Sequence, residues 1–129
     1  MIGIVIVAHG GLAREYLAAV EHVLGKQRGI EVVSIGAEHS RDNKRDQIRR
    51  AVDHVDEGEG VVVVTDMFGS SPSNLSMSAC NAADRKILYG VNLPALVKLA
   101  KCRDQPLDRA LSCALEAGRK YIDCCDGGQ

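Results

Sequence analysis

The sequence has no tryptophan and only one phenylalanine, so its hydrophobic core must be built mainly from aliphatic side chains. The sequence has almost no net charge, because its 16 basic residues nearly balance its 17 acidic residues. Nucleic-acid-binding proteins usually carry a basic excess and stacking aromatic side chains, and both are missing here. No apolar run approaches the roughly 20 residues that a membrane-spanning helix needs. The apolar N-terminus lacks a basic leader segment and predicts a buried strand, not a signal peptide.

Paired cysteine motifs are also lacking. The five cysteines are an odd number without a C-x-x-C pair, and Cys124 and Cys125 are adjacent. This pattern suits neither a disulfide framework nor a zinc site. It indicates reduced thiols in a cytoplasmic protein, several of them small core residues.

What is present is a regular alternation of strand and helix patterns over 129 residues, a length that fits one domain, 1–129. Apolar, β-branched runs predict strands at 2–8, 30–35, 61–65 and 86–91. Helical periodicity and capping residues predict helices at 12–24, from Ser40 to 55, from Pro72, at 94–100 and from 107 to about 118. Residues 121–125 either continue the last helix or form a short edge strand. The order predicts an α/β fold: a doubly wound, three-layer sandwich with a mostly parallel sheet.

Ligand sites of such folds lie beyond the carboxyl ends of the strands. His9 ends the first strand and is followed by Gly10 and Gly11, which leave room for a second molecule to approach the imidazole. Asp66 occupies the matching place after the third strand. A carboxylate beside an imidazole fixes its tautomer and leaves the other nitrogen free to react. The pair therefore predicts a nucleophilic or basic histidine, and the alternative is a histidine with a purely structural role.

The segment Gly69-Ser70-Ser71-Pro72-Ser73-Asn74 leads into a predicted helix with Ser71 as its N-cap and Pro72 as its first residue. Free backbone N–H groups, the helix dipole and the hydroxyls of Ser70, Ser71 and Ser73 would hold an anion such as phosphate. The alternative is an ordinary helix cap. The segment has no nucleotide P-loop pattern and no G-x-G-x-x-G or G-x-S-x-G motif.

A histidine, an orienting aspartate and an anion cradle at one sheet edge suggest a phosphoryl group on histidine. No metal-ligand set accompanies them, so we expect neither a metal nor a cofactor. His22 and His54 lie in predicted helices. His39 follows the second strand and could reach the rim of the site, although a solvated loop residue is the alternative.

Three segments together resemble one known family. They are the strand ending in His9-Gly10, the stretch from Thr65 to Asn74 (TDMFGSSPSN), and Gly90-Val91-Asn92-Leu93-Pro94. The sequence is similar, from Ile2 to about Tyr121, to the IIA component of the mannose family of the bacterial phosphoenolpyruvate-dependent sugar phosphotransferase system. The family loop often reads F-G-G-S-P, whereas this chain has Ser70 at the second glycine, where a positive φ would disfavour serine.

The resemblance implies a phosphotransferase in which His9 accepts a phosphoryl group on Nε2 from phosphohistidine of HPr and passes it to a IIB component. Asp66 would hold the other imidazole nitrogen, and Gly69, Ser70, Ser71 and Ser73 would bind the phosphoryl oxygens. It further implies a homodimer in which residues 121–125 form an exchanged C-terminal edge strand, antiparallel in the sheet. Separate IIB and membrane permease components would be its partners, because no linker to a IIB domain follows.

Positioning and charge stabilisation carry phosphoryl transfer, so a sparse, exposed site is sufficient. Leu12, Met67 and Phe68 would form docking surface around His9, or be partly buried under the loop. Two other functions stay open: a regulatory protein of the same fold that is phosphorylated but not coupled to transport, and a hydrolase using Ser71, His9 and Asp66. Which sugar is involved is not encoded in these residues.

Overall fold

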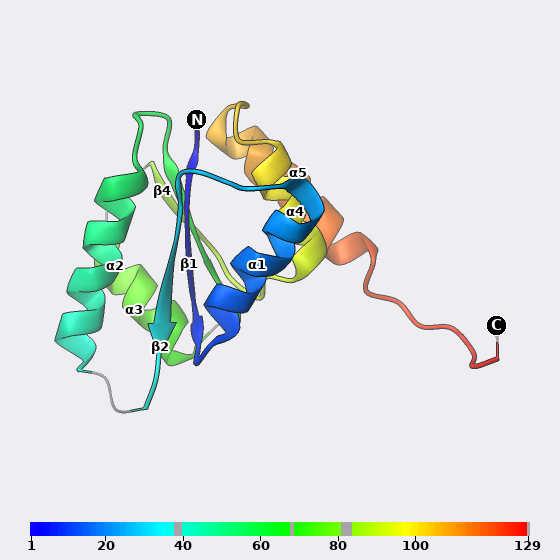
Figure 1. The fold of residues 1–129 in the computed structure, drawn as a ribbon, viewed down its shortest axis with the longest axis horizontal. Coiled ribbons are helices and arrows are strands. Elements are labelled where there is room, and N and C mark those ends of the chain that lie inside the picture. Colours follow the sequence, from blue (N-terminus) through cyan, green and yellow to red (C-terminus); the bar gives the residue numbers. More distant parts are fainter. Residues whose placement is uncertain (38–39, 68, 81–83, 129) are drawn as a thin grey trace.

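The computed structural model describes residues 1–128 except 38–39, 68 and 81–83. Strands and helices alternate along the chain until two helices close it (Figure 1). The elements are β1 Gly3–His9, α1 Leu12–Leu24, β2 Ile30–Ile35, α2 Arg41–Val55, β3 Val61–Thr65, α3 Ser71–Ala79, β4 Arg85–Leu88, α4 Leu93–Lys101 and α5 Leu107–Lys120.

The four strands form one sheet in the order β2-β1-β3-β4, and every pair is parallel. β1 lies between β2 and β3, so the chain adds β2 on one side of β1 and then β3 and β4 on the other side. The register places Val7 opposite both Val33 and Thr65, so β1, β2 and β3 end at the same sheet edge. The predicted doubly wound α/β fold is confirmed.

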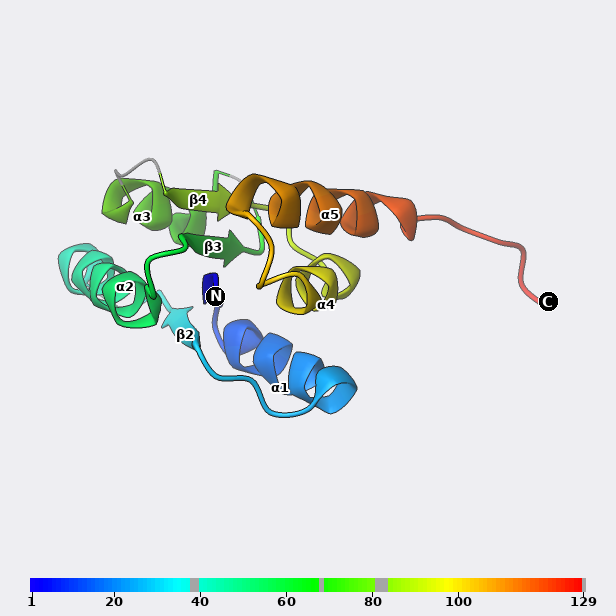
Figure 2. The same cartoon turned by 90° about the horizontal axis from the view of Figure 1, so that it is seen from above.

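Helices cover both faces of the sheet, which gives the three predicted layers (Figure 2). One core lies against α1, α4 and α5 and includes Ile4, Ile6, Leu96 and Leu99. The other lies against α2 and α3 and includes Val5, Val7, Ile48 and Leu75. Alternate residues of β1 thus point into opposite cores, as expected for a strand that is buried on both faces.

Capping residues set the start of two helices. Ser40 caps α2 as predicted, because its side chain accepts a hydrogen bond from the backbone N–H of Asn43. Asn92 caps α4 in the same way, through the N–H of Ala95. The predicted cap of α3 is wrong by one residue, since Ser70 is the N-cap and Ser71 is the first helical residue.

The last strand is shorter than predicted. β4 ends at Leu88 rather than at residue 91 because Gly90 adopts a left-handed conformation with φ 70°. Beyond this turn, the N–H of Val91 donates to the carbonyl of Thr65. The contact fixes the approach of α4 to the end of β3.

The C-terminal tail forms neither a strand nor a continuation of α5. The helix ends at Lys120, and residues 122–128 extend away from the sheet (Figure 1). The antiparallel edge strand is therefore absent from the described part of a single chain. The physical reason is that a strand needs a hydrogen-bonding partner strand, and among the described residues the tail pairs with none.

The buried side chain of Arg103 connects the segments that lead into β1 and β2. Arg103 follows α4, and its guanidinium donates to the carbonyls of Ile2, Arg28 and Gly29 at 2.7–2.9 Å. Burial lowers the pKa of this guanidinium, while Glu57 raises it. Three charge-assisted hydrogen bonds compensate for the desolvation of the cation.

Candidate functional site

His9 is the last residue of β1, and the sheet carries it from the core to the surface. The six preceding strand residues are buried, whereas the His9 side chain is 49% exposed. Gly10 follows with φ 55°, a left-handed conformation that turns the chain into α1 without a side chain over the imidazole. His9 is thus fixed by a rigid strand and open to a second molecule.

Asp66 follows β3 directly, and the parallel pairing of β1 with β3 brings it to His9. Its Oδ2 lies 2.7 Å from the imidazole Nδ1 and accepts a second hydrogen bond, at 3.1 Å, from the His9 backbone N–H. A carboxylate only accepts hydrogen bonds, so the neutral imidazole carries its proton on Nδ1 and its lone pair on Nε2. Among the described residues, none forms a hydrogen bond with Nε2.

The Asp66 carboxylate is largely enclosed, with only 11% of the side chain exposed. Its second oxygen, Oδ1, is buried and has no hydrogen-bond partner among the described residues. The low dielectric of such a site strengthens the interaction between Oδ2 and the imidazole, especially when the imidazole is positively charged.

Tyr16 of α1 lies close enough to this carboxylate to be affected by its charge, and the sequence alone did not predict this proximity. Its hydroxyl donates to the carbonyl of Val91 at 3.1 Å. Burial raises the pKa of the Tyr16 phenol, and the negative charge of Asp66 raises it further. Tyr16 thereby links the helix that follows His9 to the loop before α4. Its position in the apolar stripe of α1 identified it only as a core residue.

The N-terminus of α3 supplies the anion cradle. The first helical residue, Ser71, is exposed, and Pro72 has no N–H, so the N–H groups of Ser71 and Ser73 have no acceptor within the helix. The Ser70 hydroxyl donates to the carbonyl of Met67 at 2.6 Å and holds the turn closed. The Ser73 hydroxyl is buried without a partner among the described residues. Of the predicted phosphate ligands, Ser71 therefore presents both a hydroxyl and a backbone N–H to solvent.

The expected strain at Ser70 is not found. Gly69 adopts the left-handed conformation, with φ 80°, whereas Ser70 has φ −84° and lies in the extended region. Any L residue tolerates that conformation. The turn therefore needs a glycine at Gly69 and accepts serine at the next position.

Two apolar side chains next in sequence to the site, which were predicted as docking surface or as partly buried under the loop, are exposed. Leu12 begins α1 and is 39% exposed, and Met67 follows Asp66 and is 58% exposed. Phe68 and His39, which the sequence also placed at the rim, lie outside the described residues.

A second histidine also has a carboxylate partner. Nδ1 of His54, in the last turn of α2, lies 2.7 Å from Oε2 of Glu31 at the start of β2. This pair lies at the N-terminal end of its strand, far from the start of α3. His22 lies in the last turn of α1. A histidine–carboxylate pair alone is therefore not specific, and the adjoining helix N-terminus distinguishes His9 from His54.

The fold and the site define a class: a doubly wound α/β protein with an exposed histidine, oriented by an aspartate, beside a helix N-terminus. The chain belongs to the EIIA-man family, the PTS system fructose IIA component, whose family model matches residues 3–112. It is thus a IIA protein of the sugar phosphotransferase system, in agreement with the resemblance seen in the sequence.

Individual relatives agree with this family. The chain is 29% identical over 105 residues to "Putative phosphotransferase enzyme IIA component YadI" of Escherichia coli (strain K12), which covers 81% of this chain and 72% of YadI. It superimposes with a TM-score of 0.86 and 26% identity on phosphotransferase system component EIIA from Streptococcus agalactiae, covering 96% of this chain and 97% of that one. The mannose/sorbose-specific IIA subunit from Enterococcus faecalis has the same fold, with a TM-score of 0.86 and 20% identity, covering 98% of this chain and 96% of that one.

Among the described helices, none is both long and apolar enough to cross a membrane.

Proposed function

We propose that this chain is a cytoplasmic phosphoryl carrier in which His9 accepts a phosphoryl group from phospho-HPr and passes it to a IIB component for sugar uptake. The observation that carries the proposal is the 2.7 Å hydrogen bond between Nδ1 of His9 and Asp66. It directs the lone pair of Nε2 to the exposed side of the ring. Membership of a IIA family supports a transfer role, and membrane permease components would act downstream of IIB.

The proposed transfer needs no cofactor and no metal. The Nε2 lone pair attacks phosphorus, and the bond from phosphorus to the donor histidine nitrogen breaks, which returns a lone pair to that nitrogen. His9 retains its Nδ1 proton and becomes a phosphorylated imidazolium, whose positive charge the Asp66 carboxylate stabilises. Transfer to IIB reverses these steps.

The N-terminus of α3 would hold the phosphoryl oxygens. Ser71 offers its hydroxyl and its N–H, and Gly69 and Ser70 shape the turn. Ser73 is fully buried in the structure, so the phosphoryl group would not contact it directly. The positive end of the helix dipole adds attraction for the developing negative charge. The exposed side chains of Leu12 and Met67 would contact the protein partners around the histidine.

The experiment is incubation of the purified chain with phosphoenolpyruvate, enzyme I and HPr. We expect one acid-labile, base-stable phosphoryl group per chain, absent from His9→Ala. His54→Ala is the matched control, because His54 also pairs with a carboxylate at 2.7 Å, and it should be labelled like the wild type. Full labelling of His9→Ala would refute the proposal.

Two other functions receive less support. Ser71 donates no hydrogen bond to His9 in the described structure, so a hydrolase triad of Ser71, His9 and Asp66 is not assembled. A regulatory protein phosphorylated on His9 would share the whole site. Transfer from the phosphorylated chain to a IIB protein distinguishes the carrier from such a regulator.

We also propose a homodimer in which residues 121–125 of one chain pair with β4 of the other. In the described sheet β4 pairs only with β3, and a cavity of about 320 Å³ lies beside it, bordered by Leu88, Gly90 and Leu115. Ile122, at the start of the tail, is 76% exposed. Deletion of residues 122–129 should convert a dimer into a monomer in light scattering, and an unchanged mass would contradict the exchange.

A further inference from the structure

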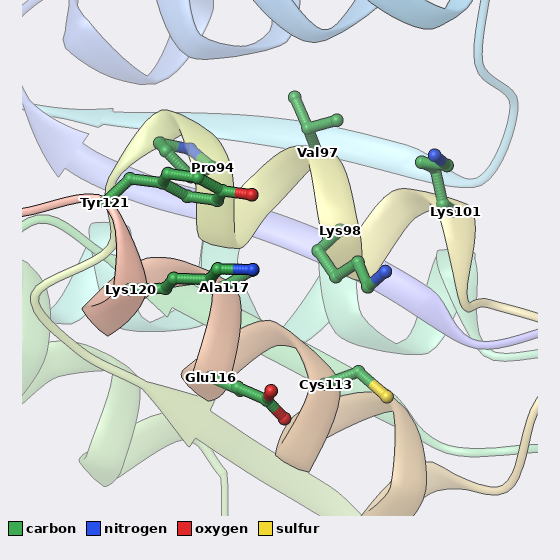
Figure 3. Close-up of a pocket in the computed structure, with 9 residues that line it drawn as sticks. All are labelled: Pro94, Val97, Lys98, Lys101, Cys113, Glu116, Ala117, Lys120 and Tyr121. Atoms are coloured by element: carbon green, nitrogen blue, oxygen red, sulfur yellow. The ribbon is translucent and has the colours of Figure 1, made fainter.

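A groove lies between α4 and α5 (Figure 3), and neither His9 nor Asp66 lines it. The helices form a hairpin, and the groove between them has a volume of about 440 Å³, within the range of small-molecule sites. Half-buried Val97, Cys113 and Ala117 form its apolar lining, while Lys98, Lys101, Glu116 and Lys120 supply charges. None of the residues proposed for phosphoryl transfer lines it.

The charged groups of the groove, three lysines and Glu116, form no ion pair with any residue that the structure describes. Arg85, by contrast, is paired with Asp56 at 2.8 Å. Each groove lysine lies in the last turn of its helix or next to its end, where the helix dipole stabilises a cation. The ammonium groups therefore stay available for a ligand.

Lining side chains come from both helices, and Lys98 and Lys120 extend along the space between them (Figure 3). Figure 3 also shows the Glu116 carboxylate on the α5 side next to Cys113, and Lys101 at one end. The ammonium of Lys120 also lies 5.4 Å from the centre of the Tyr121 ring. All the charged groups belong to the two packed helices, and Tyr121, the first residue after α5, also lines the groove.

The charged side chains of the groove indicate which kind of ligand it can bind. The three ammonium groups and one carboxylate leave two positive charges uncompensated, and a phosphate monoester carries close to two negative charges at neutral pH. Glu116 can accept hydrogen bonds from hydroxyl groups, and the apolar lining can pack against a carbon skeleton. We propose that this groove binds a small organic phosphate that also carries hydroxyl groups, the chemical class of the sugar phosphates. Binding is non-covalent and does not rest on the function proposed for His9.

The test is a titration of the unphosphorylated full chain, followed by ¹H–¹⁵N NMR, with glucose 6-phosphate, inorganic phosphate and glucose as probes. Glucose 6-phosphate should shift the amides of residues 94–101 and 113–120 saturably. Inorganic phosphate should bind about tenfold more weakly, because it lacks the contacts of the carbon skeleton and hydroxyls. Glucose should cause no shifts, because it lacks the charge.

Substitutions distinguish binding in the groove from nonspecific attraction between the anion and any surface lysine. Lys98→Gln and Lys120→Gln should each weaken binding of glucose 6-phosphate about fivefold to tenfold, whereas Lys44→Gln on α2 should not change it. Glu116→Gln should reduce the preference for glucose 6-phosphate over inorganic phosphate. Lys98, Glu116 and Lys120 are exposed, Lys44 is half-buried, and the spectra report directly whether each variant is folded.

Three results would overturn the proposal: no saturable shifts in the groove, equal affinity for glucose 6-phosphate and inorganic phosphate, or shifts confined to the N-terminus of α3. Loss of labelling on His9 in a phosphotransfer assay would leave the groove proposal untouched, since the titration uses no phosphoryl donor. The two proposals can therefore fail separately.

Discussion

Oδ2 of Asp66 accepts two hydrogen bonds from one residue, from the imidazole Nδ1 of His9 at 2.7 Å and from its backbone N–H at 3.1 Å. The same oxygen thus fixes the end of β1 and the tautomer of the ring that β1 carries. One carboxylate oxygen therefore sets both the position of the His9 ring and the nitrogen that carries its proton. Removing the carboxylate should leave both the ring position and the tautomer unfixed.

Asp66→Ala should slow phosphorylation of His9 by about a hundredfold, because the imidazolium formed in the transfer loses its counter-charge and the tautomer is no longer fixed. Rapid-quench measurement with phospho-HPr reports the rate, and circular dichroism reports whether the fold is retained. A folded variant with the wild-type rate would remove Asp66 from the mechanism.

Ser71→Asp should affect stability and transfer in opposite directions. A carboxylate in the first turn of α3 interacts favourably with the helix dipole and should stabilise the fold by about 0.5 kcal/mol. The same charge repels the phosphoryl oxygens and should slow labelling of His9 at least about tenfold. Ser78→Asp, near the other end of the helix, is the matched control and should slow labelling much less. Equal rates in both variants would show that α3 does not bind the phosphoryl group.

Arg103→Met should destabilise the protein by about 3 kcal/mol, since the buried carbonyl of Ile2 and the partly buried carbonyls of Arg28 and Gly29 lose a charged donor at once. Urea unfolding measures the change in free energy. Arg50→Met, on the exposed side of α2, should change it by less than about 0.5 kcal/mol. A similar small change for Arg103→Met would mean that water replaces the guanidinium without cost.

Asp56 should contribute to the loss of stability in acid. Its carboxylate accepts hydrogen bonds from the backbone N–H of Gly58 and from Arg85, and these lower its pKa in the folded state. A lowered folded-state pKa stabilises the fold above the unfolded-state value, about 3.9, and the gain disappears as the pH falls through the folded-state value. Asp56→Asn should therefore be less stable than the wild type at pH 7, and the difference should shrink below pH 4. Urea unfolding at several pH values tests this, and a difference independent of pH would contradict it.

Local sequence patterns predict most of the fold and the contact between His9 and Asp66. The β-branched run of β3 and the stop of α1 at Gly25 were located to the residue, because strand propensity and glycine conformation act locally. His9 and Asp66 were predicted to meet because parallel strands end at a common edge. The fold confirms this contact, while the assigned chemistry stays a proposal.

Features that depend on contacts between distant segments could not be predicted. Arg103 and Ile2 are 101 residues apart, and no pattern around Arg103 indicates a buried guanidinium. Tyr16 occupied a core position in the helical pattern, and only the folded chain shows its hydroxyl near the loop before α4. The cap of α3 shifted by one residue because Ser70 and Ser71 are chemically alike. The tail was ambiguous because a strand at 121–125 needs a partner that one chain does not contain.

The most direct test of the central claim is ¹⁵N NMR of the histidine rings after phosphorylation with phosphoenolpyruvate, enzyme I and HPr. The account predicts that Nε2 of His9 changes to the resonance of a phosphorylated nitrogen, while Nδ1 keeps its proton and its hydrogen bond to Asp66. The rings of His22 and His54 should stay unmodified. Phosphorylation on Nδ1 of His9, or on another histidine, would contradict it.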